Sequence, residues 1–224
     1  MKDTAATTGR LANLPQILPI FPLRGALLLP RGHLPLHIFE PRYRRMTEAA
    51  LRGERMIGMV QPRDPDFETV ADDGLIYDTG CAGRIISFTE IDDGRFLLTL
   101  RGVCRFRIAS ELALQDGFRR VRPDYQPFWK DVSEPVALAL DRDQLIGSVH
   151  RYVHAKGLTA DWPAIKEATD EALVVALSMM CPFEPREKQA LLECRDLPEL
   201  AHLLTSLLEM GTRDADGAGS GVAH

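Results

Sequence analysis

The pattern of apolar and polar positions changes character once along the chain. From residue 17 to about residue 125, apolar runs of four to eight residues alternate with turn residues, which is typical of β-strands. The runs IFPL, ALLLP and LPLHIF are broken by prolines and by Arg-Gly pairs. Because proline has no N–H to donate to a sheet, we expect these prolines at strand ends, edges or bends. The pattern predicts short strands that turn corners, as in a small barrel.

One helix is predicted to interrupt the strands. Pro41 stands where a first helical turn tolerates proline, and apolar residues then recur at helical spacing until Gly53. After this helix, MIGMV predicts a buried strand, and CAGRIISFTEI and RFLLTL flank an Asp92-Asp93-Gly94 hairpin turn. Residues 103–109 and 118–122 predict two further strands.

The strand over residues 103–109 has two different faces. Val103, Arg105 and Arg107 alternate with apolar residues along VCRFRIA. Because successive side chains of a strand point to opposite faces, one face of this strand is expected to be buried. The face that carries the two arginines is expected to be exposed.

After Pro127 the strand pattern gives way to helical periodicity. Ser133 is expected to open a first helix that reaches about His154, and Asp161 to cap a second that ends near Met180. Glu184-Pro185 opens a third helix, and Asp196 caps a fourth that carries a leucine stripe.

Together these patterns predict two structural units between two tails. A β-rich domain is expected over residues 14–126 and an α-helical subdomain over residues 131–210. The segments 1–13 and 211–224 are small and polar, and we expect them to be disordered tails.

The charge distribution agrees with two units. The chain has 224 residues and a net charge of −5, of which residues 1–130 contribute +3 and residues 131–224 contribute −8. Neither half has the strong positive charge of a dedicated nucleic-acid-binding protein. The apolar runs are too short to span a bilayer, and the first residues contain no continuous apolar segment of a signal peptide. We therefore expect a cytoplasmic protein without membrane contact, with its four cysteines buried and reduced.

Motifs for catalysis and cofactor binding are absent from the folded part of the sequence. It contains no GxxxxGK[ST] phosphate loop, no GxGxxG after a strand and no GxSxG nucleophile elbow. His150 and His154 stand four apart on a predicted helix and could share a face toward a metal, but HRYVH lacks the glutamate of HExxH. We expect no catalytic residue, no cofactor and no metal, with these histidines solvated or structural.

Clusters of arginine near aromatic residues keep a nucleic-acid groove open as an alternative. The arginines stand at positions 42, 44 and 45, at 101, 105 and 107, and at 119, 120 and 122. A groove of cations and stacking aromatics is the usual way in which proteins bind single strands. The competing interpretation is that these arginines line a solvated strand face and a solvated helix face.

The order of several segments resembles a known family. LPIFPLRGALLLPRGHLPLHIFEPRYRRM, IGMVQPR, YDTGCAGRI, the DDG turn and LRGVCRFRI together resemble the N-terminal substrate-binding domain of Lon proteases. DEALVVALSMMCPFEPREKQALLE is similar to the second half of stand-alone versions of that domain. The resemblance implies an α+β fold, in which an N-terminal PUA-like β pseudo-barrel with one interrupting helix is followed by a C-terminal α-helical bundle.

The resemblance also implies a function. In full-length Lon proteases this region recognises substrate polypeptides, whereas an ATPase module and a Ser-Lys dyad, whose signatures this sequence lacks, carry out the chemistry. We therefore expect a non-enzymatic protein that binds unfolded or flexible polypeptides, with a separate protease or chaperone as a further candidate partner. RNA binding by a PUA-like module is the alternative, and the oligomeric state stays open.

The candidate polypeptide-binding residues lie where IFEPRYRR passes from strand to helix. They are Phe39, Pro41, Arg42, Tyr43 and Arg45. Arg42 and Arg45 are three apart and share one helical face, with Tyr43 adjacent. Phe39 and Pro41 are expected to add apolar surface. The competing interpretation places Phe39 and Tyr43 in the core and leaves the arginines merely solvated.

Overall fold

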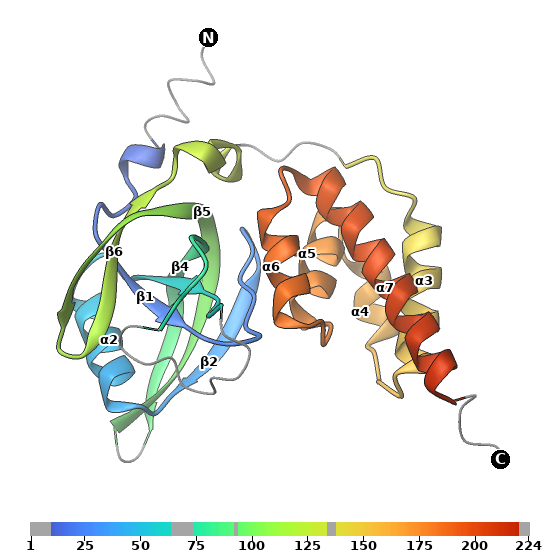
Figure 1. Cartoon of the computed structure of the whole chain (residues 1–224), viewed down its shortest axis with the longest axis horizontal. Coiled ribbons are helices and arrows are strands. Elements are labelled where there is room, and N and C mark those ends of the chain that lie inside the picture. Colours follow the sequence, from blue (N-terminus) through green and yellow to red (C-terminus); the bar gives the residue numbers. More distant parts are fainter. Residues whose placement is uncertain (1–9, 64–73, 92–93, 134–137, 220–224) are drawn as a thin grey trace, which may run out of the picture.

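The β-rich half of the chain precedes the helical half, as the sequence predicts. The computed structural model describes residues 10–63, 74–91, 94–133 and 138–219 (Figure 1). The strands form one body and the C-terminal helices pack beside it, joined by the segment around residue 130 (Figure 1). This arrangement confirms the predicted α+β fold.

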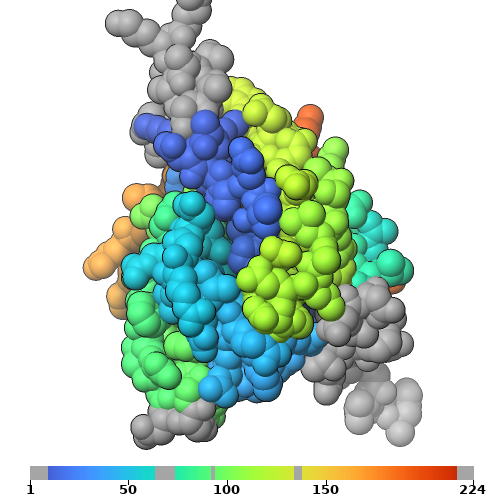
Figure 2. Space-filling view, turned by 90° about the vertical axis from the view of Figure 1, so that its left-hand side faces the viewer, coloured from blue at the N-terminus to red at the C-terminus, as the bar shows by residue number. Residues whose placement is uncertain are grey.

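Six strands form one sheet. In spatial order they are β2, β5, β4, β3, β1 and β6, and β5 also pairs with β6. Their bounds are Leu18–Pro22 (β1), His33–Ile38 (β2), Met56–Val60 (β3), Thr79–Ile91 (β4), Arg95–Gln115 (β5) and Phe118–Asp124 (β6). On the face turned away from the bundle, the N-terminal segment, in blue, lies between cyan and lime-green parts of the chain (Figure 2). In the sheet, β1 pairs with β3 on one side and with β6 on the other.

The sheet closes into a pseudo-barrel through one long strand. β5 pairs with β4 from Arg95 to Arg107 and with β6 from Arg107 onward, so the two pairings meet at a single residue. The sequence predicts two separate strands in this region, but β5 is one continuous strand of 21 residues. Because β5 pairs with both β4 and β6, the strands β5, β4, β3, β1 and β6 form a closed ring. β2 pairs only with β5 and lies outside this ring, so the six-stranded sheet is a pseudo-barrel and not a true barrel.

Local signals correctly predict the helix of the β-rich half and the places of its prolines. Helix α2 spans Pro41–Arg52 and ends at Gly53. Pro35 lies on β2, which is the end strand of the sheet, and Pro22 is the last residue of β1. Pro19 lies in the part of β1 that pairs with β6 but not with β3, so its missing N–H breaks no pairing with β3.

Five α-helices and a 3₁₀ segment make up the described part of the C-terminal half. They are η2 (Gln126–Val132), α3 (Arg142–Ala155), α4 (Trp162–Glu167), α5 (Asp170–Met180), α6 (Pro185–Glu193) and α7 (Leu197–Gly219). The N-terminal residues predicted for α4, α6 and α7 are confirmed, because Asp161 and Asp196 cap α4 and α7 and Glu184 forms a capping box on α6.

Two helix boundaries differ from the sequence prediction. Helix α3 does not begin at Ser133; it begins at Arg142, because the Asp141 carboxylate accepts the N–H of Gln144. Residues 134–137 lie outside the described residues. The single helix predicted from Asp161 to Met180 is two helices, because the Thr169 hydroxyl caps a new one. In both cases the helix begins directly after the residue whose side chain caps it, which is Asp141 for α3 and Thr169 for α5.

The predicted tails are partly structured. Helix α7 continues to Gly219, so residues 211–219 are helical and not a disordered tail. A Cβ atom at Gly211 would lie 2.6 Å from the Tyr152 ring on α3, so glycine allows α7 to pack closely there. At the other end, residues 10–12 are helical and Leu11 and Leu14 are buried. Residues 1–9 and 220–224 lie outside the described residues.

One hydrophobic cluster joins the two halves. It contains core residues of the sheet, such as Leu100 and Phe118, together with Leu145 of α3 and Leu204 of α7. A second cluster, which includes Phe106 and Val121, fills the interior of the pseudo-barrel. The two predicted units therefore share a continuous core, which fixes the surfaces along their boundary.

Candidate functional site

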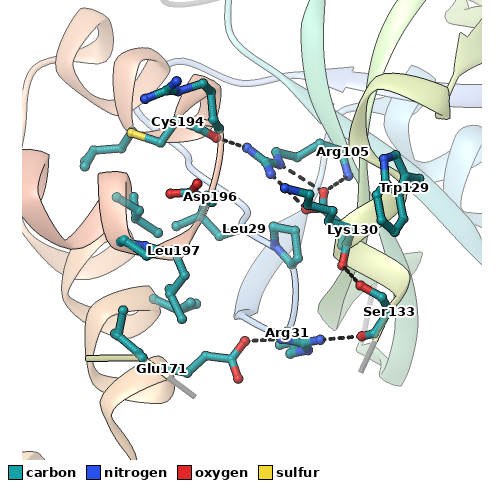
Figure 3. Close-up of a pocket in the computed structure, with 18 residues that line it drawn as sticks. Leu29, Arg31, Arg105, Trp129, Lys130, Ser133, Glu171, Cys194, Asp196 and Leu197 are labelled. Carbon is teal, nitrogen blue, oxygen red and sulfur yellow. Dashed lines mark hydrogen bonds and ion pairs between the residues drawn. The ribbon is translucent and has the colours of Figure 1, made fainter. Parts of the chain in front are cut away.

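The boundary between the sheet and the helical bundle is held by Arg105 of β5. Its Nε donates to Asp131 Oδ2 at 2.9 Å and its Nη2 to Asp131 Oδ1 at 2.8 Å, and its backbone N–H also reaches Oδ2. Its Nη1 donates to the carbonyl oxygen of Leu192 at 3.1 Å. It also donates to that of Cys194, a contact that Figure 3 shows. The prediction that Arg105 lies on an exposed strand face is therefore wrong, because the residue is only 8% exposed.

Arg105 is charged in this environment. Burial opposes the charge of its guanidinium, but the hydrogen bonds and charge of Asp131 outweigh this and raise the pKa of Arg105. The pair spans β5 and η2, and the two carbonyl contacts extend it to the chain after α6. One side chain thus links three parts of the fold.

Further polar contacts cross the same boundary. Arg31 forms an ion pair with Glu171 of α5 and donates to the carbonyl of Ser133 at 2.9 Å (Figure 3). Lys188 Nζ of α6 donates to the carbonyl of Gly25 at 2.7 Å. These links fix the distance between the two halves at several points.

Two adjoining cavities lie along this boundary. The first, of about 420 Å³, is mostly apolar, and its apolar lining comes from both halves: Leu29, Leu138, Val175, Leu191, Leu197 and Leu200. The second, of about 710 Å³, is lined by Arg63, Tyr77, Arg107, Phe128 and Glu193 among others. Trp129, which is 46% exposed, borders both cavities. No sequence pattern indicates these cavities, because their walls come from segments far apart in the chain.

The residues predicted to bind polypeptides are divided between surface and core. Phe39 is 59% exposed, and Pro41 is also exposed at the start of α2. Tyr43 is 5% exposed and packs against Phe21, with ring centroids 4.1 Å apart, so its side chain belongs to the core.

The two predicted arginines lie on the α2 surface with partners in the fold. The Arg42 guanidinium lies over the Tyr43 ring, 4.7 Å from its centroid, and forms an ion pair with Glu40 at 3.1 Å. Arg45 is exposed, and its Nε donates to the carbonyl of Asp116 at 2.7 Å. The structure thus brings Phe39, Pro41, Arg42 and Arg45 to one end of α2, above a buried Tyr43.

A row of exposed side chains continues from Phe39 along the sheet. Pro35 and His37 of β2 are exposed, Leu97 of β5 pairs with His37, and the His37 ring centroid lies 5.7 Å from that of Phe39. We call Pro35, His37, Phe39 and Leu97 the outer strip. The alternation in HLPLHI, where Leu36 and Ile38 are buried, was the signal for this exposed face.

The other arginine clusters do not form continuous cationic faces in the part of the chain that the structure describes. The arginine face of β5 loses its middle member because Arg105 is buried, and Arg119 is likewise buried against Glu111. His150 stacks on Trp162 with ring centroids 4.4 Å apart. Within the described ranges, no three His, Cys, Asp or Glu side chains come together in a way that could hold a metal. None of the described helices has the length and apolar character to cross a membrane.

Comparisons with known proteins agree on one family. Residues 17–210 match the family described as ATP-dependent protease La (LON) substrate-binding domain. "Lon protease 2" of Myxococcus xanthus is 29% identical over 209 residues, which cover 88% of this chain and 24% of that protein. The chain therefore spans about a quarter of that relative's length.

Solved structures show the same fold. A Lon N-terminal domain protein from Xanthomonas campestris superposes with a TM-score of 0.55 at 22% identity, covering 87% of this chain and 98% of that one. The N-terminal domain of a Lon protease of the Mycobacterium avium complex also gives a TM-score of 0.55, at 17% identity, covering 88% of this chain and 98% of that one.

Proposed function

The chain belongs to the family of LON substrate-binding domains, and from this premise we propose that it is a non-enzymatic receptor for flexible polypeptide segments. The match covers the substrate-binding region of the family, and this supports a binding role without catalysis. The bound segment would then be available to a separate protease or chaperone.

The observation that carries this proposal is the outer strip. It places Phe39 and Leu97, which are 59% and 47% exposed, beside Pro35 and His37 on one sheet face. Clustered exposed apolar side chains on a soluble surface typically mark an interaction site. An unfolded segment offers apolar side chains of its own, and burying apolar area is worth about 25 cal/mol per Å².

Arg42 and Arg45 border the same surface in the proposal. Guanidinium groups donate to backbone carbonyls, which an unfolded segment presents without partners. The buried Tyr43 would not contact the segment itself but would hold the Arg42 guanidinium, which lies over its ring, in position. Because these side chains already have partners within the fold, we expect them to contribute less than the apolar residues.

A binding assay with an outer-strip variant tests the proposal. The probe is a fluorescently labelled, reduced and alkylated protein that cannot refold, and binding is measured by anisotropy. Phe39→Ser combined with Leu97→Ser should weaken binding at least tenfold, a loss of about 1.4 kcal/mol. The thermal midpoint should change little, since exposed substitutions usually cost under about 0.5 kcal/mol.

The matched control removes exposed apolar side chains elsewhere. Leu114 and Leu158 are 44% and 41% exposed and lie outside the outer strip. Leu114→Ser with Leu158→Ser should leave the affinity unchanged. Equal weakening in both double variants would show that general surface apolarity, and not the outer strip, drives binding. If the folded wild-type protein bound no unfolded chain, the receptor proposal itself would be wrong.

A further inference from the structure

The two cavities along the boundary adjoin each other and are chemically different. They share Arg105, Trp129, Lys130 and Arg195 in their walls. We call the joined cavities the seam groove, with an apolar end of about 420 Å³ and a cationic end of about 710 Å³. Figure 3 shows the apolar end, with Cys194 and Leu197 on the bundle side and Arg105 and Trp129 on the other side.

The cationic end has more positive than negative side chains. Arg63, Arg107, Lys130 and Arg195 line it, against the two carboxylates Asp78 and Glu193. Arg105 adds no net charge, because it is paired with Asp131. Since the whole chain has a net charge of −5, this is a local concentration of cations on an acidic protein.

Most of these cations are available to a ligand. Neither Arg107 nor Lys130 forms an ion pair with any residue in the part of the chain that the structure describes. Arg63 pairs with Asp78 and Arg195 with Glu199, but all four side chains are substantially exposed. Exposed pairs of this kind are weak, typically under about 1 kcal/mol, so a carboxylate of a ligand can replace the partner.

The groove also offers apolar and aromatic surface at fixed positions. Trp129 lies between the two ends, and Tyr77 and Phe128 line the cationic end. The Arg105 guanidinium lies 4.8 Å from the Phe128 ring centroid, which anchors that ring. Because the walls are fixed by the contacts of Arg105 and Arg31 across the boundary, a ligand would not have to order them, which favours binding.

We propose that the seam groove binds an acidic polypeptide segment that carries a large apolar side chain. The apolar side chain fills the apolar end, and neighbouring carboxylates pair with Arg107 and Lys130. The inference rests on the proposed polypeptide-binding function and adds a second site and a sequence preference to it. The outer strip holds apolar segments of any charge, whereas the seam groove selects acidic ones.

The apolar lining of the other end argues for a polypeptide over a nucleic acid. Leucine and valine side chains make up much of that end, and of its carboxylates Glu171 is paired with Arg31 and Asp131 with Arg105. A nucleic acid carries a negative charge at every phosphate, so its continuation into the apolar end would place phosphates against apolar side chains. A polypeptide can place its acidic residues at the cationic end only and a neutral apolar residue at the other.

Trp129 provides a direct readout of binding. The chain has two tryptophans, and Trp162→Phe leaves Trp129 as the only one. We would titrate this variant with a flexible peptide that contains one phenylalanine followed by four glutamates, and with the same peptide carrying glutamines. The acidic peptide should change Trp129 emission with saturation, and its affinity should fall steeply as salt increases. The glutamine peptide should bind at least tenfold more weakly.

Charge-removing variants locate the site. Arg107→Gln with Lys130→Gln should weaken binding of the acidic peptide at least tenfold. The matched control is Arg101→Gln with Lys166→Gln, since both residues are exposed and neither lines the groove. The control should bind as wild type does. The outer-strip variant, Phe39→Ser with Leu97→Ser, should also keep its affinity for the acidic peptide.

The outcomes separate this inference from the proposed function. If wild type binds the unfolded protein but the acidic peptide leaves Trp129 emission unchanged, the seam-groove proposal is overturned and the receptor proposal stands. Equal affinity for the glutamate and glutamine peptides overturns it as well. An RNA oligonucleotide that bound more tightly than the peptide, with the same sensitivity to Arg107→Gln and Lys130→Gln, would identify the occupant as nucleic acid and overturn it too.

Discussion

Substituting Arg105 with methionine is expected to lower the free energy of unfolding by about 3–5 kcal/mol. Methionine keeps much of the apolar volume and removes the guanidinium. The Asp131 carboxylate, whose side chain is 7% exposed, then loses its cation and keeps only the backbone N–H of residue 105. Breaking a buried ion pair by removing one partner typically costs about 3–5 kcal/mol, because the other charge stays buried.

A double-mutant cycle separates the charge of Asp131 from the other contacts of Arg105. Asp131→Leu alone should also destabilise, because it leaves Arg105 buried without its anion. The double variant should be less destabilised than the sum of the two, with a coupling of about 2 kcal/mol. It should not recover wild-type stability, because the carbonyls of Leu192 and Cys194 lose their donor, at about 1–3 kcal/mol for each unsatisfied group.

Urea unfolding followed by circular dichroism and by tryptophan emission measures these free energies. Arg101, an exposed arginine on the same strand, is the matched control, and Arg101→Met should change stability by less than about 0.5 kcal/mol. A loss below about 1 kcal/mol for Arg105→Met would refute the reasoning. Strict additivity in the cycle would show that Arg105 and Asp131 do not act as a pair.

Three further predictions concern the buried thiols and one glycine of the core. Burial raises the pKa of Cys181 and of Cys194 to about 11. At pH 8 these thiols should therefore react with a disulfide reagent at least about 100-fold more slowly in the native protein than in the protein unfolded in urea. Comparable rates in the two states would contradict their burial. Because native cysteines keep their protons where unfolded ones lose them, the free energy of unfolding should fall as pH rises above about 8.5, by up to about 1.4 kcal/mol per pH unit for each thiol. Lys188, whose pKa is lowered by burial, acts in the opposite direction. A free energy of unfolding that stayed constant from pH 8 to 10 in reducing buffer would argue against this mechanism. Gly102→Ala should lower the free energy of unfolding, measured in urea, by more than about 2 kcal/mol, because a Cβ atom there would lie 2.0 Å from the Leu29 carbonyl oxygen. A variant as stable as wild type would mean that this backbone can shift.

Much of the local structure and part of the candidate site follow from short sequence patterns. Helix α2 between Pro41 and Gly53, and the caps at Asp161 and Asp196, depend on contacts within a few residues, so the sequence states them directly. The exposed position of Phe39 and the surface positions of the two α2 arginines also agree with the prediction. The serial order of the quoted sequence motifs indicated the family that the comparison shows.

Tertiary structure decided which of the predicted surface groups are buried. The sequence left Tyr43 either at the predicted binding surface or in the core, and the packing of its ring against Phe21 of β1 places it in the core. Likewise, α7 continues past residue 211, and Gly211 packs closely against Tyr152 on α3, a neighbour that composition cannot reveal.

Arg105 shows the physical reason for this division. Alternation along VCRFRIA correctly places its side chain on the face opposite Phe106, and that much is a property of any strand. Whether that face meets water depends on Asp131, 26 residues away, and on carbonyl groups 87 and 89 residues away. The sequence therefore determines the direction of a side chain along its strand. The packing of distant segments determines whether the charge of that side chain remains in water or is paired in the interior. In this protein the same packing also creates the seam groove.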